Sequence, residues 1–141
     1  MFLLLSKLLF GFEAINYTHY ASWQNDPSIK ICDKRINIDN VIQSYYYWQD
    51  ANFVNITYIS QGDCEFKRNG VIYIDVDDSL SEATNAETDT TYKNVDKEIL
   101  MSIIKVSSLN ASRVDILTHE IGHAIGINHT KNPDDIMYHL Q

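Results

Sequence analysis

The sequence is poor in basic residues, and it has neither a long apolar run nor a flexible linker. Against 19 Asp and Glu there are only 11 Lys and Arg, so the formal net charge is −8. Nucleic acids and anionic membranes require clustered cations, and this balance argues against both as partners. No apolar run approaches the roughly 18 residues of a membrane-spanning helix. With only 5 Gly and 2 Pro among 141 residues, and no internal repeat, the chain is expected to form one domain.

Cysteine is also scarce, since Cys32 and Cys64 are the only two. They either form one disulfide or serve as two small core residues, and the sequence favours neither. Four Asn-x-Ser/Thr sequons, a mild excess over chance, begin at Asn16, Asn55, Asn110 and Asn128. Together these features predict a secreted, extracellular protein.

The first 14 residues, MFLLLSKLLFGFEA, form the one apolar tract that bears on targeting. Their length suits the hydrophobic region of a signal peptide, although Lys7 interrupts the tract and no basic residue precedes it. The alternatives are that this tract is a first apolar helix of the domain or that it results from an incorrectly assigned start of the gene. We interpret residues 1–14 as a leader of this kind, ahead of the folded domain.

Apolar periodicity predicts strands and helices in an α+β order. Alternating or β-branched segments predict strands at residues 28–32, 53–60, 70–76 and 98–106, with a short exposed edge strand at 88–92. A first helix is predicted from a cap at Asp39 to residue 50, and its aromatic residues 45–48 are interpreted as core rather than as a ligand-stacking surface. A second helix follows a cap at Asn110 or Ser112 and buries Val114, Leu117, Ile121 and Ile125.

Residues 75–89 contain six acidic side chains and no basic one. Such a run is typical of a solvated loop. The alternative is a calcium site, because clustered carboxylates are the ligands that this cation prefers. Asp75, Asp77 and Asp78 are the candidate ligands.

The stretch HEIGHAIGINH holds three of the five histidines. His119 and His123 are four residues apart, so on a helix they project from one face and can chelate one zinc ion. Glu120 lies about 100° around that helix, too far to join the pair, but it can reach a water bound to the same metal. It is therefore the candidate general base for a water whose pKa zinc lowers.

Gly126 stands where a continued helix would carry the chain away from the metal. Glycine accepts the left-handed conformation that ends a helix and turns the chain back. His129 can then become the third ligand, and the fourth position stays open for water or substrate, as in catalytic zinc sites.

These residues resemble the signature of the metzincin zinc peptidases, HExxHxxGxxH followed by a methionine turn. Met137 lies eight residues beyond His129 and matches that turn. Thr130 and the segment at 136–138 resemble the matrixins within the group. His139 stands where matrixins usually have proline, and we interpret it as a surface histidine.

The resemblance implies a zincin-like α+β fold. We expect a twisted, mixed sheet of four or five strands, with a backing helix and the active-site helix on one side. Residues 15–141 would form the catalytic domain, without the C-terminal helix that the family usually has. No segment resembles the cysteine switch of the matrixin propeptide.

The same resemblance implies a zinc-dependent endopeptidase that acts on polypeptides. Glu120 would be the general base and zinc the cofactor. Calcium, which the acidic run at residues 75–89 indicates, is the second candidate ion, and a monomer is the expected state. Substrates would lie along the edge formed by Thr88, Thr90 and Thr91, adding a strand through main-chain hydrogen bonds. The alternative is a catalytically inactive zinc domain that binds a partner protein.

Overall fold

The computed structural model describes residues 17–50, 54–81 and 84–139, so the predicted leader at 1–14 lies outside the described residues. The strands are β1 (Ser28–Ile31), β2 (Ile59–Gln61), β3 (Val71–Val76), β4 (Ala86–Tyr92) and β5 (Ile99–Val106). The helices are α2 (Ile38–Asp50), the short 3-10 helix η2 (Ser108–Asn110) and α3 (Val114–Ala124).

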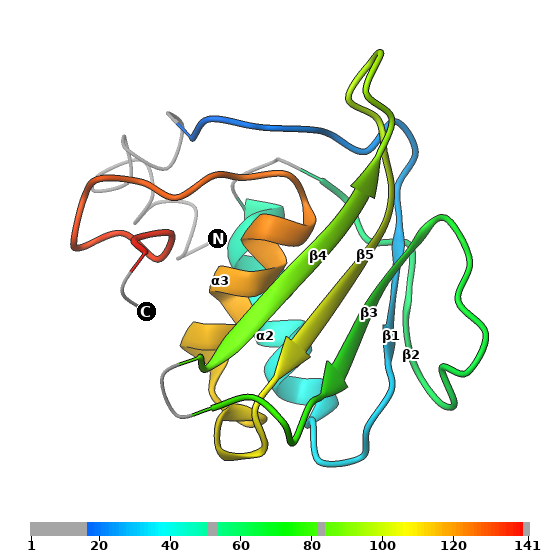
Figure 1. Cartoon of the computed structure of the whole chain (residues 1–141), viewed down its shortest axis with the longest axis vertical. Coiled ribbons are helices and arrows are strands. Elements are labelled where there is room, and N and C mark those ends of the chain that lie inside the picture. The colour runs from blue at the N-terminus through cyan, green and yellow to red at the C-terminus, as the bar shows by residue number, and fades with distance from the viewer. Residues whose placement is uncertain (1–16, 51–53, 82–83, 140–141) are drawn as a thin grey trace.

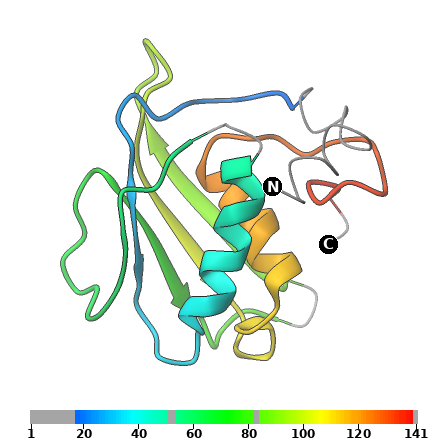
Figure 2. The ribbon, with the colours of Figure 1, turned by 180° about the vertical axis from the view of Figure 1, so that it is seen from behind.

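All five strands belong to one sheet in the order β2-β1-β3-β5-β4 (Figure 1). Strands β1, β2, β3 and β5 are parallel, and β4 pairs antiparallel to β5 at one edge. Figure 2 shows α2 and α3 side by side against one face of this sheet. The predicted α+β class, with a mixed sheet and both helices on one side, is confirmed.

The main core lies between the sheet and the two helices. Its largest fully buried side chains include Ile72, Ile74 and Ile104 from the sheet, Trp48 from α2, and Leu117 and Ile121 from α3. The Trp48 indole nitrogen donates a hydrogen bond of 2.8 Å to the Thr118 carbonyl, which joins the two helices. The core interpretation therefore holds for Trp48, whereas Tyr46 is 51% exposed.

Both helices begin differently from the prediction. Asp39 does not cap α2, because the Asn37 side chain accepts a hydrogen bond of 2.8 Å from the Asp39 N–H and so takes that role. Neither Asn110 nor Ser112 caps α3, which begins after Arg113 without a side-chain cap. Asn110, the last residue of η2, instead donates hydrogen bonds from its side-chain amide to Asn85 and to Ser107, the residue before η2.

The predicted strand at 53–60 is wrong over residues 54–58, and residue 53 lies outside the described part. The regular strand β2 begins only at Ile59. Its partner β1 begins at Ser28, directly after Pro27. Proline has no N–H to donate to a ladder, so regular pairing cannot extend past it, although its carbonyl accepts a hydrogen bond of 2.9 Å from the Thr57 N–H.

Cys32 and Cys64 form a disulfide, with their Cα atoms 5.4 Å apart. The bond ties the residue after β1 to the connection between β2 and β3. None of the helices in the described part of the chain has the length and apolar character needed to cross a membrane.

Candidate metal centre and catalytic site

Three imidazoles converge at the second helix. His119 and His123 lie one turn apart on α3, and His129 comes from the segment after it. The Nε2 atom of His123 is 3.1 Å from that of His119 and 3.0 Å from that of His129. Within the described residues, this is the one group of three or more His, Cys, Asp or Glu whose ligand atoms all lie within 4.8 Å of one another.

Main-chain carbonyls orient two of these rings. The Nδ1 atom of His119 is 2.7 Å from the Ile136 oxygen, and that of His123 is 2.8 Å from the Ile127 oxygen. A carbonyl can only accept, so in each neutral ring Nδ1 carries the proton and donates it. Each Nε2 atom therefore presents a lone pair to the point where the rings meet.

This arrangement fits a zinc ion. Tetrahedral coordination with Zn–N bonds of about 2.0–2.1 Å places the ligand nitrogens about 3.3 Å apart. The observed separations of 3.0 and 3.1 Å are within a few tenths of an ångström of that value. Three imidazoles are the kind of donor set found in catalytic zinc sites, whereas closed structural sites have four protein ligands.

Burial keeps the three rings neutral. It lowers the pKa of His119 and His129, and lowers that of His123 to about 4. A protonated ring would be poorly solvated, and protonating a second ring beside it would add repulsion between like charges. At neutral pH the ligand nitrogens are therefore available without a proton having to be displaced.

The turn after α3 brings the third histidine back. Gly126 has φ of 100°, its N–H donates to the His123 carbonyl, and the Ile127 N–H donates to the Gly122 carbonyl. These two bonds form the Schellman motif that ends a helix with a left-handed residue. A Cβ at Gly126 would also overlap the Ala21 carbonyl, so only glycine fits there.

Met137 packs beneath the centre and is fully buried. A Cβ added at Gly122 would overlap both the Met137 sulfur and the Trp48 ring, so the close packing of α3 on this methionine requires glycine. The Met137 N–H is held by the Asp135 carboxylate at 2.8 Å. Sequence reasoning missed Gly122, although a glycine inside a helical pattern is itself a signal of close packing.

Side chains cap the carbonyls at the end of α3. The Tyr20 hydroxyl donates to the His123 carbonyl, and the Trp23 indole donates to the Ala124 carbonyl at 2.9 Å. These carbonyls lie in the last turn of α3, where the helix offers no N–H four residues further along the chain to bond them. Neither aromatic residue was a candidate from sequence, because nothing in their spacing points to a helix more than 100 residues away.

The Glu120 carboxylate is buried beside β4, with the whole residue only 6% exposed. Its Oε2 atom accepts a hydrogen bond of 2.5 Å from the Thr88 hydroxyl. Burial raises the pKa of Glu120, and the Thr88 hydrogen bond opposes that shift. Thr88 was predicted only as part of a substrate edge, so its contact with Glu120 is a further finding.

A cleft of about 360 Å³ opens between β4 and α3. The three imidazoles and Glu120 line it, together with Ile116, His139 and residues 84–88. His139 was interpreted as a surface histidine, and it is indeed exposed, but its ring centroid lies 6.3 Å from that of His129. The cleft therefore has a histidine at its rim that is outside the three-histidine group.

The edge strand predicted at residues 88–92 is present as part of β4, which begins two residues earlier, at Ala86. The Asn85 carbonyl accepts a hydrogen bond of 2.9 Å from the Ser107 N–H of the neighbouring segment. In an antiparallel pair the main chain of every second residue bonds the partner strand, so the odd-numbered residues of β4 face β5 and the even-numbered ones face away. Residue 91 then pairs with β5, whereas the main chain of Thr88 and Thr90 is turned to the open edge. Thr91 thus does not share the orientation of the other two.

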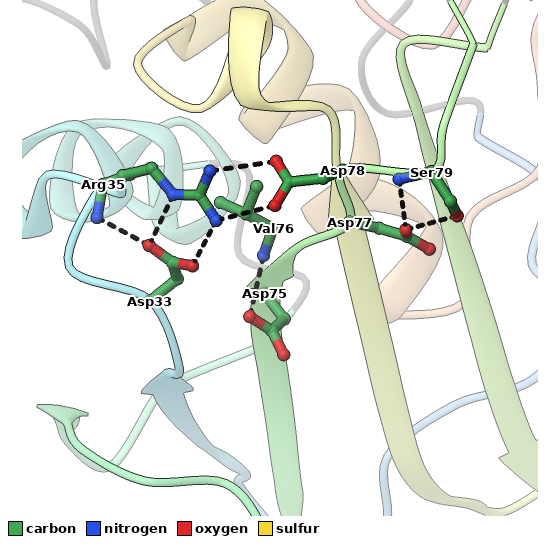
Figure 3. A network of polar contacts seen from close by, with 7 residues as sticks. All are labelled: Asp33, Arg35, Asp75, Val76, Asp77, Asp78 and Ser79. Carbon is green, nitrogen blue, oxygen red and sulfur yellow. Dashed lines mark hydrogen bonds and ion pairs between the residues drawn. The ribbon is translucent and has the colours of Figure 1, made fainter.

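The candidate calcium ligands do not converge in the described structure. Asp75 accepts a hydrogen bond from the main-chain N–H of the next residue, Asp77 accepts two from Ser79, and Asp78 pairs with Arg35 at 2.9 Å (Figure 3). The three carboxylates thus have separate partners. Calcium binding by this run stays a prediction.

The sheet, the two helices and the three-histidine centre define a metzincin-type zinc-peptidase fold. The sequence model of one family, the matrixins, matches residues 48–141. The chain therefore belongs to the matrixin family. Among curated proteins, no match is found.

Proposed function

We propose that this matrixin-family chain is a zinc-dependent endopeptidase in which His119, His123 and His129 bind zinc and Glu120 is the general base. The observation that carries the proposal is the convergence of three neutral imidazoles beside a buried carboxylate in an open cleft. A domain that only bound a partner would have no chemical need for that carboxylate.

Zinc bound to the three imidazoles would supply Lewis acidity, polarising the scissile carbonyl and acidifying the attacking water. Glu120 accepts the proton of that water and then passes it to the departing amine. Burial raises the pKa of Glu120 and so brings it closer to the neutral range in which a base both accepts and returns a proton.

Polypeptide substrates would bind in extended form along β4. The outward main chain of Thr88 and Thr90 offers hydrogen bonds to an added strand. Glu120 and the imidazoles lie on the other side of the same cleft, so a peptide held at this edge would have its backbone next to the catalytic groups. This arrangement supports cleavage within a chain.

We also propose that the protein acts outside the cell. The disulfide between Cys32 and Cys64 supports this location, because such bonds persist in oxidising compartments and are rare in the cytosol.

The decisive experiment is Glu120→Gln. Glutamine has the same size and can still accept the Thr88 hydrogen bond, but it cannot take a proton. Because Glu120 is not among the three histidine ligands, the variant is expected to fold and bind zinc as the parent does. General acid–base transfer contributes about 10²–10⁴-fold, so cleavage of a peptide library should fall by at least about 100-fold.

Glu98→Gln is the matched control, since it removes a carboxylate that pairs with Lys93 and is not among the residues that line the cleft. It should keep the parent rate. A parent that is fully loaded with zinc and cleaves no peptide would instead identify an inactive partner-binding domain. A Glu120→Gln variant with the parent rate would exclude Glu120 as the base.

A further inference from the structure

We infer that Thr88 is a positioning residue for the reaction: its hydroxyl holds the carboxylate of Glu120 in the orientation from which it accepts a proton. The inference rests on the proposed function, because it concerns how Glu120 acts. It adds a side-chain role to a residue that otherwise contributes only main chain to the substrate edge.

The first observation is the geometry of the contact. The Thr88 Oγ1 atom lies 2.5 Å from Oε2 of Glu120 and 3.3 Å from the Glu120 main-chain oxygen. A hydroxyl has a single proton, and the shorter, charge-assisted bond to the carboxylate is the stronger of the two. The hydroxyl therefore bridges from the strand to the carboxylate and leaves Oε1 as the oxygen that Thr88 does not occupy.

The second observation is that the donor stands on a rigid support. Thr88 pairs with Ile104, which is fully buried in β5. Along β4 the side chains alternate, so Thr88 is half-buried towards α3 while its neighbours Glu87 and Asp89 are exposed. The position of the hydroxyl is therefore set by the sheet rather than by a flexible loop.

The third observation is that, within the described residues, Thr88 donates the side-chain hydrogen bond that the Glu120 carboxylate accepts. Glu120 is one residue away from His119 on α3, but its side chain leaves the helix towards β4 and has three rotatable bonds. A buried carboxylate without a donor would turn to other rotamers or draw in water. The Thr88 bond selects one rotamer, which removes an orientational cost from proton transfer.

Two substitutions at one position separate this role from simple packing. Thr88→Val keeps the β-branched shape and the main chain but removes the donor, whereas Thr88→Ser keeps the donor and loses a methyl group. We expect Thr88→Val to lower kcat about tenfold with KM changed less than twofold. Thr88→Ser should stay within about threefold of the parent kcat.

Thr118→Val is the matched control. Thr118 is a buried threonine on α3 whose hydroxyl donates its proton to the Val114 carbonyl of its own helix, not to the Glu120 carboxylate. The same substitution there removes a buried hydroxyl without changing the restraint on the carboxylate. Its kcat should remain within about twofold of the parent value.

A second readout does not depend on activity. Urea unfolding midpoints are measured at fixed free zinc for the parent, Thr88→Val, Glu120→Ala and the double variant. Thr88→Val should lower the midpoint when Glu120 is present, because it strands a buried carboxylate. In the Glu120→Ala background the same change should lower it by less than a third as much, since the hydroxyl then has no carboxylate to hold.

Reduced kcat in Thr88→Val, recovery in Thr88→Ser and coupled midpoints support the inference. Unchanged kcat in Thr88→Val overturns it, as do equal losses in the Val and Ser variants or additive midpoints. A zinc-loaded parent without peptidase activity overturns the proposed function itself and this role with it. That outcome differs from failure of the inference alone, in which the parent is active.

Discussion

Replacing Gly122 by alanine tests whether the packing of α3 on Met137 supports the metal centre. Helix propensity alone favours alanine over glycine by about 1 kcal/mol. The added Cβ would, however, overlap the sulfur of Met137 and the ring of Trp48, which are both fully buried. Overpacking of this kind costs about 1–3 kcal/mol, and the Trp48 hydrogen bond to the Thr118 carbonyl limits how far the ring can move.

Because several buried atoms are overlapped, we take the overpacking cost near the upper end of that range. Subtracting the gain in helix propensity leaves an expected net loss of about 2 kcal/mol in the free energy of unfolding. For a chain of 141 residues this corresponds to a Tm about 5–10 °C lower. Zinc binding should weaken as well. Met137 follows Ile136, whose carbonyl holds His119, and loss of such support for a metal ligand typically costs about 10–100-fold in affinity.

The assays are calorimetric melting of the zinc-loaded protein and competition for zinc with a chelator of known affinity. Gly62→Ala is the matched control, because a Cβ there would meet only the Lys30 side chain, at 3.5 Å or more. It should leave both Tm and zinc affinity unchanged. A Gly122→Ala variant as stable as the parent would mean that helix propensity outweighs the overlap, and the reasoning from packing would be refuted.

Three other predictions follow from the centre, the edge strand and the acidic run. His129→Ala should lower the zinc content of the purified protein steeply, since two imidazoles rarely retain the metal; unchanged stoichiometry would remove His129 from the ligands. Thr90→Pro removes an N–H that faces the open edge and should raise KM. Thr91→Pro instead breaks pairing with β5 and should mainly lower Tm. Equal KM values for the parent and Thr90→Pro would mean that substrates do not bind along this edge. If the carboxylates of residues 75–89 bind calcium, Tm should rise with free calcium up to millimolar concentrations, and a flat Tm would return the run to a solvated loop.

Much of the fold could be predicted because the spacing of apolar residues along the chain indicates which side chains are buried. The interior strand β5 and the edge strand β4 were both found from their patterns, apolar in one and polar in the other. The prediction was wrong where a segment has a strand-like pattern of its own but the segment beside it cannot pair with it. Residues 54–58 have a strand-like pattern, but regular pairing stops at Pro27 of the neighbouring chain segment. The predicted cap at Asn110 was wrong for a similar reason, because its side-chain amide bonds Asn85, which is distant in sequence, and Ser107, the residue before η2.

The sequence by itself determined the three-histidine group. Its geometry is local, since His119 and His123 are one helical turn apart and Gly126 turns the chain so that His129 returns within a few residues. Such short spacings leave few conformations to choose between. Spacing along a helix is therefore enough to predict which side chains meet.

Only the tertiary structure decided which distant groups complete the site. The pairing of Cys32 with Cys64 spans 32 residues, and the contact of Thr88 with Glu120 also spans 32. Over such separations the chain can close in many ways, and each closure has a similar entropic cost. The choice among them is made by the packing of the sheet against α3, which no local pattern encodes.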